Sequence, residues 1–227
     1  MWAHDLRGGA RPVPRGRAVV PRHGGGRLIE HAVEALREGR PVVLPTDTVY
    51  GLCADPHREE PVREVYRMKQ RPAEQPTALL ALDVDVLVEL VPELTGRAGA
   101  LVRALLPGPF TLVLPNPAER FRWLTGATPD RIGVRVPELA GPGAEVLAEV
   151  GAVVATSANL RGGPEPTRLE DVPVELRAGA AAVVDGGELP GTPSTVLDLT
   201  GPEPTVIREG AVPAAQAIER ALAAAGG

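Results

Sequence analysis

Apolar residues at helical spacing follow a Gly-, Pro- and Arg-rich start and mark where the ordered chain begins. The spacing predicts a helix that begins near Arg27 and ends before Gly39, a residue that commonly stops a helix. Its apolar positions are Leu28, Ala32, Val33 and Leu36. We expect residues 27–212 to form the main domain, with residues 213–227 as its closing helix and tail.

The rest of the chain divides into short apolar runs and longer segments with helical periodicity. Helices are expected at Pro61–Gln70, Leu87–Val91, Ala98–Leu106, Gly143–Val150 and Ala214–Ala224. Strands are expected at Pro41–Leu44, Ala78–Leu82, Phe110–Leu114, Ile132–Val136, Val153–Thr156, Ala182–Val184, Ser194–Leu199 and Thr205–Arg208. Helices and strands alternate irregularly, and strands that follow one another late in the chain favour some antiparallel pairing. This order predicts one α/β domain with a twisted mixed sheet.

Composition narrows the class of protein. Of 227 residues, 44% are hydrophobic and 23% are charged, as in ordinary globular proteins. Aromatic residues make up only 3%, so the core must be built mainly from Val, Leu, Ala and Ile. The net charge of −5 disfavours a strongly basic duplex binder and leaves a local basic groove open.

The first 26 residues are rich in Gly, Pro and Arg and show no apolar period, which predicts a disordered basic tail. Its charge could contact RNA, or the tail could be a solvated extension without a specific role. Cys53 is the only cysteine, so a disulfide framework and a thiolate zinc site are excluded, as suits a reducing cytosol. No apolar run is long enough for a membrane span or a secretory signal.

Polar residues concentrate at strand ends, where an α/β scaffold carries its sites. The strand at Pro41–Leu44 runs into the segment Pro45–Leu52, which contains Thr46, Asp47 and Thr48. Small hydroxyl groups at a strand exit can bind an amino acid or a phosphate. Alternatively, Asp47 and Thr48 satisfy backbone amides in a turn.

Lys69–Pro72 supplies two cations at the end of a predicted helix. Arg71 can hold a phosphate in bidentate fashion, and Pro72 forces the chain out of the helix. The alternative is that Lys69 and Arg71 only stabilise the helix C-terminus.

Two further segments flank predicted strands. Pro107–Leu114 is interpreted as architecture, because two prolines and a glycine make a rigid approach to a buried strand. In Gly133–Pro137, strand alternation places Val134 and Val136 on one face and Arg135 on the other. Arg135 should therefore face solvent or an anion such as a carboxylate.

Three later segments add hydroxyl, amide and guanidinium groups at strand edges. Ser157 and Asn159 of Thr156–Asn159 can donate hydrogen bonds to phosphate, ribose or adenine, or can form a local turn. Ser194–Asp198 and Ile207–Gly210 contribute another hydroxyl group and another isolated arginine. Phosphate-binding and dinucleotide-binding glycine motifs are absent, as are the zinc-protease and serine-hydrolase motifs.

Together, in this order and spacing, these segments resemble the YrdC/Sua5 family of threonylcarbamoyl-AMP synthases. The resemblance runs from about Leu28 to Val212 and is most specific at PTDTVYGL (Pro45–Leu52) and TSAN (Thr156–Asn159). It implies a YrdC/RibB-like α/β fold, with a twisted mixed sheet and flanking helices around a concave cavity. Long members of the family carry a second, C-terminal domain, which we do not expect here, because the chain ends at Gly227.

The resemblance also implies an activity and its partners. A cytoplasmic nucleotidyltransferase would condense L-threonine, bicarbonate or CO2, and ATP to threonylcarbamoyl-AMP, pyrophosphate and water. Mg2+ would be held by the ATP phosphates and not by protein ligands. The product would pass to the tRNA threonylcarbamoyl-transferase complex for t6A modification of adenosine 37. The chain itself could also contact tRNA weakly.

Residue by residue, the resemblance implies two substrate-binding groups and no catalytic nucleophile. The threonine group is Thr48, Arg135, Ser157 and Ser194. The ATP group is Lys69, Arg71, Gln75, Asn159, Thr167 and Arg208. Three positions depart from the family pattern: Gln75, Leu80, where some relatives have a threonine-contacting histidine, and Arg161, which replaces a serine.

The residue types suit this chemistry. A carbamate that attacks the α-phosphate of ATP needs positioning and charge neutralisation more than it needs a protein nucleophile. Two alternatives belong to other classes: a non-catalytic RNA-binding module of the same fold, and a carbamoyl-transfer paralogue. Few aromatic residues disfavour the first, and one cysteine in 227 residues disfavours the second.

Overall fold

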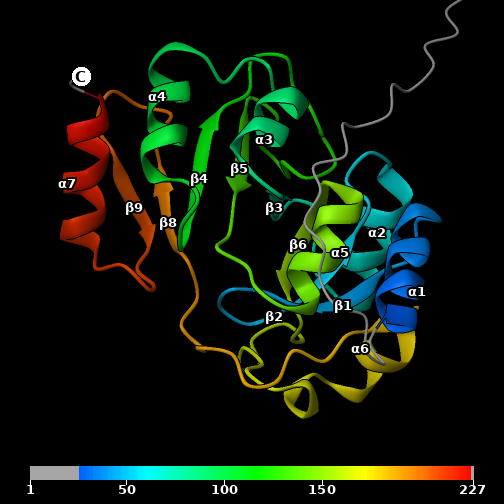
Figure 1. Cartoon of the computed structure of the whole chain (residues 1–227). Helices are drawn as coiled ribbons and strands as arrows, with labels where there is room; N and C mark the ends of the chain where they lie inside the picture. The colour runs from blue at the N-terminus through cyan, green and yellow to red at the C-terminus, as the bar shows by residue number, and fades with distance from the viewer. Residues whose placement is uncertain (1–25, 226–227) are drawn as a thin grey trace, which may run out of the picture.

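The computed structural model describes residues 26–225, and within this range nine strands form one twisted mixed sheet (Figure 1). The strands are β1 (Val42–Pro45), β2 (Tyr50–Ala54), β3 (Ala78–Ala81), β4 (Phe110–Pro115), β5 (Arg131–Arg135), β6 (Ala152–Ser157), β7 (Ala182–Val183), β8 (Thr195–Asp198) and β9 (Thr205–Arg208). Their order is β7-β1-β2-β6-β3-β5-β4-β8-β9. The pairs β1–β7, β3–β5 and β4–β8 are parallel and the other five are antiparallel, which confirms the predicted mixed sheet.

Seven α-helices in the described part of the chain flank this sheet. They are α1 (Gly26–Arg37), α2 (Glu59–Met68), α3 (Val84–Leu90), α4 (Gly96–Leu105), α5 (Pro142–Val150), α6 (Val174–Gly179) and α7 (Ala214–Ala225). A 3-10 turn at Leu169–Asp171 precedes α6. The basic tail predicted for residues 1–26 lies outside the described residues except for Gly26, which begins α1. None of the described helices is long and apolar enough to cross a bilayer.

The helices cover the two faces of the sheet unequally. On one face, α2, α3, α4, α6 and α7 bury the larger apolar cluster, with α7 packed against α4. On the other face, α1 and α5 cover β7, β1, β2 and β6 and bury a smaller cluster. Within residues 26–225, no helix covers the second face of β5, β4 and β8, and β3 lies at the border of the covered part, with Leu80 in the smaller cluster (Figure 1).

The uncovered strands follow a simple alternation. Leu79, Leu112, Val134 and Leu197 are fully buried in the larger cluster, on the covered face. Their chain neighbours point the other way, because side chains alternate along a strand. These neighbours include Leu80, Val113, Gly133 and Val196, and they form the floor of a hollow.

Two elements differ from the sequence-based prediction. β2 lies partly within the polar PTDTVYGL segment, where we expected a loop, and all five of its residues are buried. Tyr50, Leu52 and Ala54 enter the larger apolar cluster and Cys53 enters the smaller one, so both faces of β2 are covered and no alternation is visible in its sequence. The short helix α6 was also missed, because it spans six residues and buries only Leu176.

Candidate functional site

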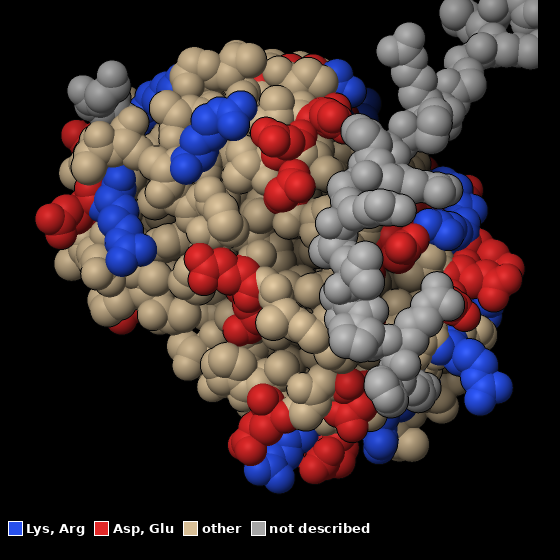
Figure 2. Space-filling view, in the orientation of Figure 1, with Lys and Arg blue, Asp and Glu red and all other residues tan. Residues whose placement is uncertain are grey.

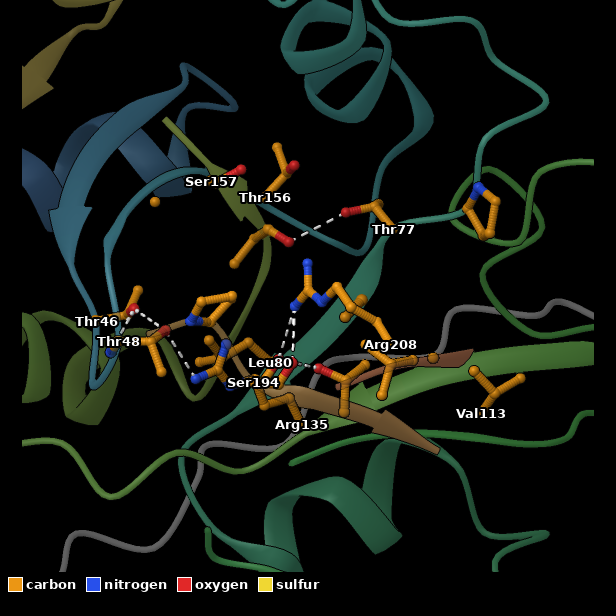
Figure 3. Close-up of a pocket in the computed structure, with 18 of the residues that line it drawn as sticks. Thr46, Thr48, Thr77, Leu80, Val113, Arg135, Thr156, Ser157, Ser194 and Arg208 are labelled. Atoms are coloured by element: carbon orange, nitrogen blue, oxygen red, sulfur yellow. Dashed lines mark hydrogen bonds between the residues drawn. The ribbon is translucent and has the colours of Figure 1, made fainter. Parts of the chain in front are cut away.

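A cavity of about 330 Å³ lies over the uncovered strands (Figure 3). Six of the predicted site residues line it: Thr48, Arg71, Arg135, Ser157, Ser194 and Arg208. They come from the β1–β2 turn, the segment after α2, strands β5, β6 and β9, and the residue immediately before β8. Elements that are distant in the sequence therefore meet at one surface.

The turn between β1 and β2 is organised by Thr46. Its hydroxyl oxygen accepts hydrogen bonds from the backbone N–H groups of Thr48 and Val49, both at 3.3 Å, and donates to the Val49 carbonyl at 2.6 Å. The alternative in which Asp47 and Thr48 satisfy the backbone amides of this turn is not what the structure shows. Because Thr46 does so, the side chains of Asp47 and Thr48 remain available for Arg135.

Arg135 points into the cavity, one of the two placements that strand alternation left open. Val134 and Val136 are buried on the opposite face. The Arg135 guanidinium donates through Nη2 to the Asp47 carboxylate and, at 3.1 Å, to Thr48 Oγ1 (Figure 3). Its Nε is buried and has no hydrogen-bond partner among the described residues. Arg135 thus has a fixed carboxylate partner and retains a free donor.

Lys69 stands behind the cavity wall and does not line it. Its ammonium group donates to the Ser157 carbonyl, to the Asn159 carbonyl at 2.8 Å and to Asn159 Oδ1 at 3.0 Å. Burial, reinforced by the nearby charge of Arg71, lowers the pKa of Lys69 to about 8. Lys69 therefore fixes the loop after β6 and keeps a positive charge close to the cavity at neutral pH.

Arg71 reaches the cavity because the chain leaves α2 abruptly, with Gln70 at a φ of 52°. Its guanidinium donates to Thr156 Oγ1 at 3.1 Å and to the Pro76 carbonyl, and lies over the Tyr66 ring at 5.6 Å. These contacts hold the side chain in place without neutralising its charge. Its Nε is buried and has no hydrogen-bond partner in the described part of the chain.

The opposite wall is formed by β4, β8 and β9. Ser194 Oγ lies 2.8 Å from Thr111 Oγ1, and Arg208 donates to the Ser194 carbonyl at 2.9 Å (Figure 3). Arg208 also lies 3.7 Å from Glu165 of the loop after β6, across the cavity mouth. Hydroxyl and guanidinium donors therefore converge on the cavity from this side too.

Tyr50 of the PTDTVYGL segment has an architectural role. Its single hydroxyl proton lies within hydrogen-bond reach of two acceptors, Asp185 Oδ1 at 3.0 Å and the Gly187 carbonyl at 2.8 Å, and its oxygen accepts from the Gly186 N–H. Burial is the largest cause of the raised pKa of this hydroxyl. Tyr50 thus ties the segment before β8 to the β1–β2 turn.

Besides Lys69, three predicted site residues lie outside the cavity lining. Gln75 is exposed. Its backbone carbonyl accepts a hydrogen bond from the Tyr66 hydroxyl group. Asn159 bridges Lys69 and the Gly163 carbonyl, so it shapes the loop after β6. Thr167 bonds to Asp171 at 3.3 Å. Their roles toward a nucleotide stay predictions.

The lining also contains residues that sequence reasoning missed. Thr111 belongs to Pro107–Leu114, which we interpreted as architecture. Its side chain nevertheless lines the cavity and contacts Ser194. Arg131 lies four positions before Arg135 on the same face of β5, so the alternation that revealed Arg135 would have revealed it too. No periodic pattern in the sequence pointed to Glu165, because it lies in a loop. Of the positions that depart from the family pattern, Leu80 lines the cavity, whereas Arg161 is exposed and does not line it.

The chemistry of this lining is that of binding and charge neutralisation. It contains four arginines and several hydroxyl groups, and no His or Cys among the described residues that line it. Nor does the described part of the chain contain a cluster of three or more metal-ligating side chains. Cys53 is buried, which raises the pKa of its thiol to about 12, so it is an inert core residue as expected.

Comparison with known proteins points to one family. The family model described as telomere recombination, Sua5/YciO/YrdC, matches residues 34–210. A threonylcarbamoyl-AMP synthase of Pyrococcus abyssi is 36% identical over 188 residues, which are 82% of this chain and 54% of that protein. One of Escherichia coli is 38% identical over 183 residues, 78% of this chain and 94% of that protein. The chain therefore spans about half of the first relative and nearly all of the second.

Solved structures agree with this grouping. P. abyssi Sua5 complexed with L-threonine is 34% identical, with a TM-score of 0.76, over 85% of this chain and 56% of that one. E. coli YciO is 30% identical, with a TM-score of 0.73, over 85% of this chain and 93% of that one. The fold, the ordered motifs and the matched residues lead to one conclusion: this chain belongs to the Sua5/YciO/YrdC family.

Proposed function

We propose that this chain is a threonylcarbamoyl-AMP synthase that condenses L-threonine, bicarbonate or CO2, and MgATP to threonylcarbamoyl-AMP, pyrophosphate and water. The observation that carries the proposal is the cavity, which gathers hydroxyl and guanidinium donors from six segments and has no nucleophile–base pair among its described lining residues. The names of the matched relatives support the same activity.

The amino-acid end of the cavity is proposed to lie at Arg135. Free donors of Arg135 would hold the threonine carboxylate, and Thr48 lies beside it. Ser157 and Ser194, on opposite walls, offer hydroxyl groups for the side chain or the carbamate. Leu80, 3% exposed, gives this end an apolar wall that suits the threonine methyl group.

The nucleotide end is proposed to lie at Arg71 and Arg208, with Lys69 behind them. A triphosphate carries several negative charges, and guanidinium groups bind phosphate in bidentate fashion. Mg2+ is expected to arrive with ATP, held by phosphate oxygens. Gln75, Asn159 and Thr167 would act at the edge of this end, through the loops that they shape.

The reaction would then proceed by positioning. The threonine amine adds to CO2 and loses a proton, which gives a carbamate. A carbamate oxygen attacks the α-phosphorus of ATP, the bond to the β,γ-phosphates breaks, and pyrophosphate leaves. Arg71, Arg208 and Lys69 would neutralise the charge that builds on the phosphates. The acyl adenylate would be passed to the tRNA threonylcarbamoyl-transfer machinery in the cytoplasm.

The direct kinetic test is pyrophosphate release by the purified chain. We expect release only when L-threonine, bicarbonate and MgATP are all present. A matched control is Arg103→Ala on α4, because Arg103 lies outside the cavity lining and its side chain is 60% exposed. Release that does not depend on threonine, or none from folded protein, would reject the proposal in favour of a paralogous transfer or an RNA-binding role.

A further inference from the structure

The four arginines of the cavity differ in whether their charge is already compensated. Three of them pair with a carboxylate: Arg131 with Asp198 at 3.0 Å, Arg135 with Asp47, and Arg208 with Glu165 at 3.7 Å. Arg71 pairs with none within the described residues, since its partners are a hydroxyl, a carbonyl and an aromatic ring. The positive charge of the cavity is therefore concentrated toward Arg71.

The Arg135–Asp47 pair is the most enclosed of the three. Its side chains are 12% and 9% exposed, against 43% and 20% for Arg131–Asp198. Water screens an enclosed pair least, so Asp47 cancels the charge of Arg135 more fully than Asp198 cancels that of Arg131. Asp47 is not part of the cavity lining, so it acts on ligands through Arg135 and through its charge.

We propose that Asp47 sorts the two substrates by charge, making the Arg135 end of the cavity a site for zwitterions and a poor site for phosphate. This inference rests on the proposed function. A free amino acid at neutral pH carries one positive and one negative charge, which suits a guanidinium–carboxylate pair with no net charge. The triphosphate is strongly anionic and is directed to uncompensated Arg71. Asp47 is thus a specificity-determining residue.

Asp47→Asn is the most selective perturbation of this pair. It preserves the size of the side chain and one acceptor oxygen for Arg135, but it removes the negative charge. Arg135 then becomes a net cation, and ligands that carry only a negative charge should bind relatively better. Because charges a few Å apart interact strongly inside a protein, we expect a shift of about tenfold or more.

The experiment measures two dissociation constants by calorimetry on the full chain. The ligands are L-threonine and 3-hydroxybutanoate, which keeps the carboxylate and the hydroxyl group but lacks the ammonium group. Asp47→Asn should shift the ratio of the two constants toward 3-hydroxybutanoate, and Asp198→Asn should leave the ratio near the wild-type value. An unshifted ratio in Asp47→Asn, or an equal shift in Asp198→Asn, would overturn the inference.

A second background keeps the test decisive if Asp47→Asn folds poorly. The double variant Asp47→Asn/Arg135→Gln buries no unpaired charge and is easier to accommodate. Compared with Arg135→Gln alone, it should again shift the ratio toward 3-hydroxybutanoate, because the negative charge of Asp47 disfavours a purely anionic ligand in this background too. An unchanged ratio would overturn the inference. Failure of the wild type to bind threonine would instead overturn the proposed function.

Discussion

Arg135 is the residue on which the threonine end of the site depends, and its environment sets two expectations at once. Arg135→Ala removes the proposed carboxylate partner and also leaves Asp47, 9% exposed, without a counter-charge. We expect the KM for threonine to rise by about 10²-fold and the free energy of unfolding to fall by about 3 kcal/mol. Steady-state kinetics and denaturant titration measure the two effects. A loss of stability with an unchanged KM would make Arg135 purely structural.

Arg71 offers the corresponding prediction for ATP. Arg71→Ala should raise the KM for ATP by about 10²-fold, because a charged hydrogen-bond network to phosphate is lost, while threonine binding changes little. The control is Arg67→Ala on the neighbouring helix α2, since Arg67 is 74% exposed and pairs with Glu64. If both variants bind ATP equally well, Arg71 is only a helix-terminal cation.

Lys69 gives a prediction with a defined pH window. Its pKa is lowered from 10.5 to about 8, chiefly by burial, so the folded state disfavours its charged form. That penalty is fully present below pH 8 and is relieved as pH rises from 8 to 10.5. Over this window wild type should gain about 3 kcal/mol of stability relative to Lys69→Met. Denaturant titration of both proteins at matched pH values measures the difference; a constant difference contradicts the lowered pKa.

At the scale of elements, the segment that follows β9 approaches the segment that precedes β8 closely, which predicts a sensitive glycine. A Cβ on Gly210 would lie 2.2 Å from the Pro193 carbonyl oxygen and 2.6 Å from Ser194 backbone atoms. Gly210→Ala should therefore displace Ser194 and destabilise the fold by about 1–3 kcal/mol. Gly201→Ala is the matched control, because its nearest contact would be an ordinary 3.8 Å. Thermal unfolding and the threonine KM should both distinguish the two variants, and equal behaviour would argue against the tight approach.

The elements also show how far the sequence predicts this site. Alternation along β5 was enough to place Arg135 on the face opposite Val134 and Val136, because a strand permits only two directions for a side chain. The same reasoning failed at β2, where both faces are buried and no alternation remains. The division of roles between Thr46 and Asp47 could not be predicted either. It depends on Arg135, which is 88 residues away from Asp47 and reaches it only through the sheet.

At the scale of the whole molecule, the unequal cover of the sheet creates the site. Two helices shield four strands of one face (Figure 1). The part of that face that they leave uncovered becomes the cavity floor. On the face shown in Figure 2, Lys and Arg side chains are interspersed with Asp and Glu. The face in this view is therefore not the broad basic surface that is typical of nucleic-acid binding.

The central claim is that one cavity joins threonine to AMP through a carbamate. The most direct measurement is mass spectrometry of the products formed by the purified chain from L-threonine, MgATP and 13C-labelled bicarbonate. The predicted result is threonylcarbamoyl-AMP that carries the label in its carbamoyl carbon, formed together with pyrophosphate. AMP and pyrophosphate without the labelled adduct, or an adduct that forms without threonine, would contradict the claim.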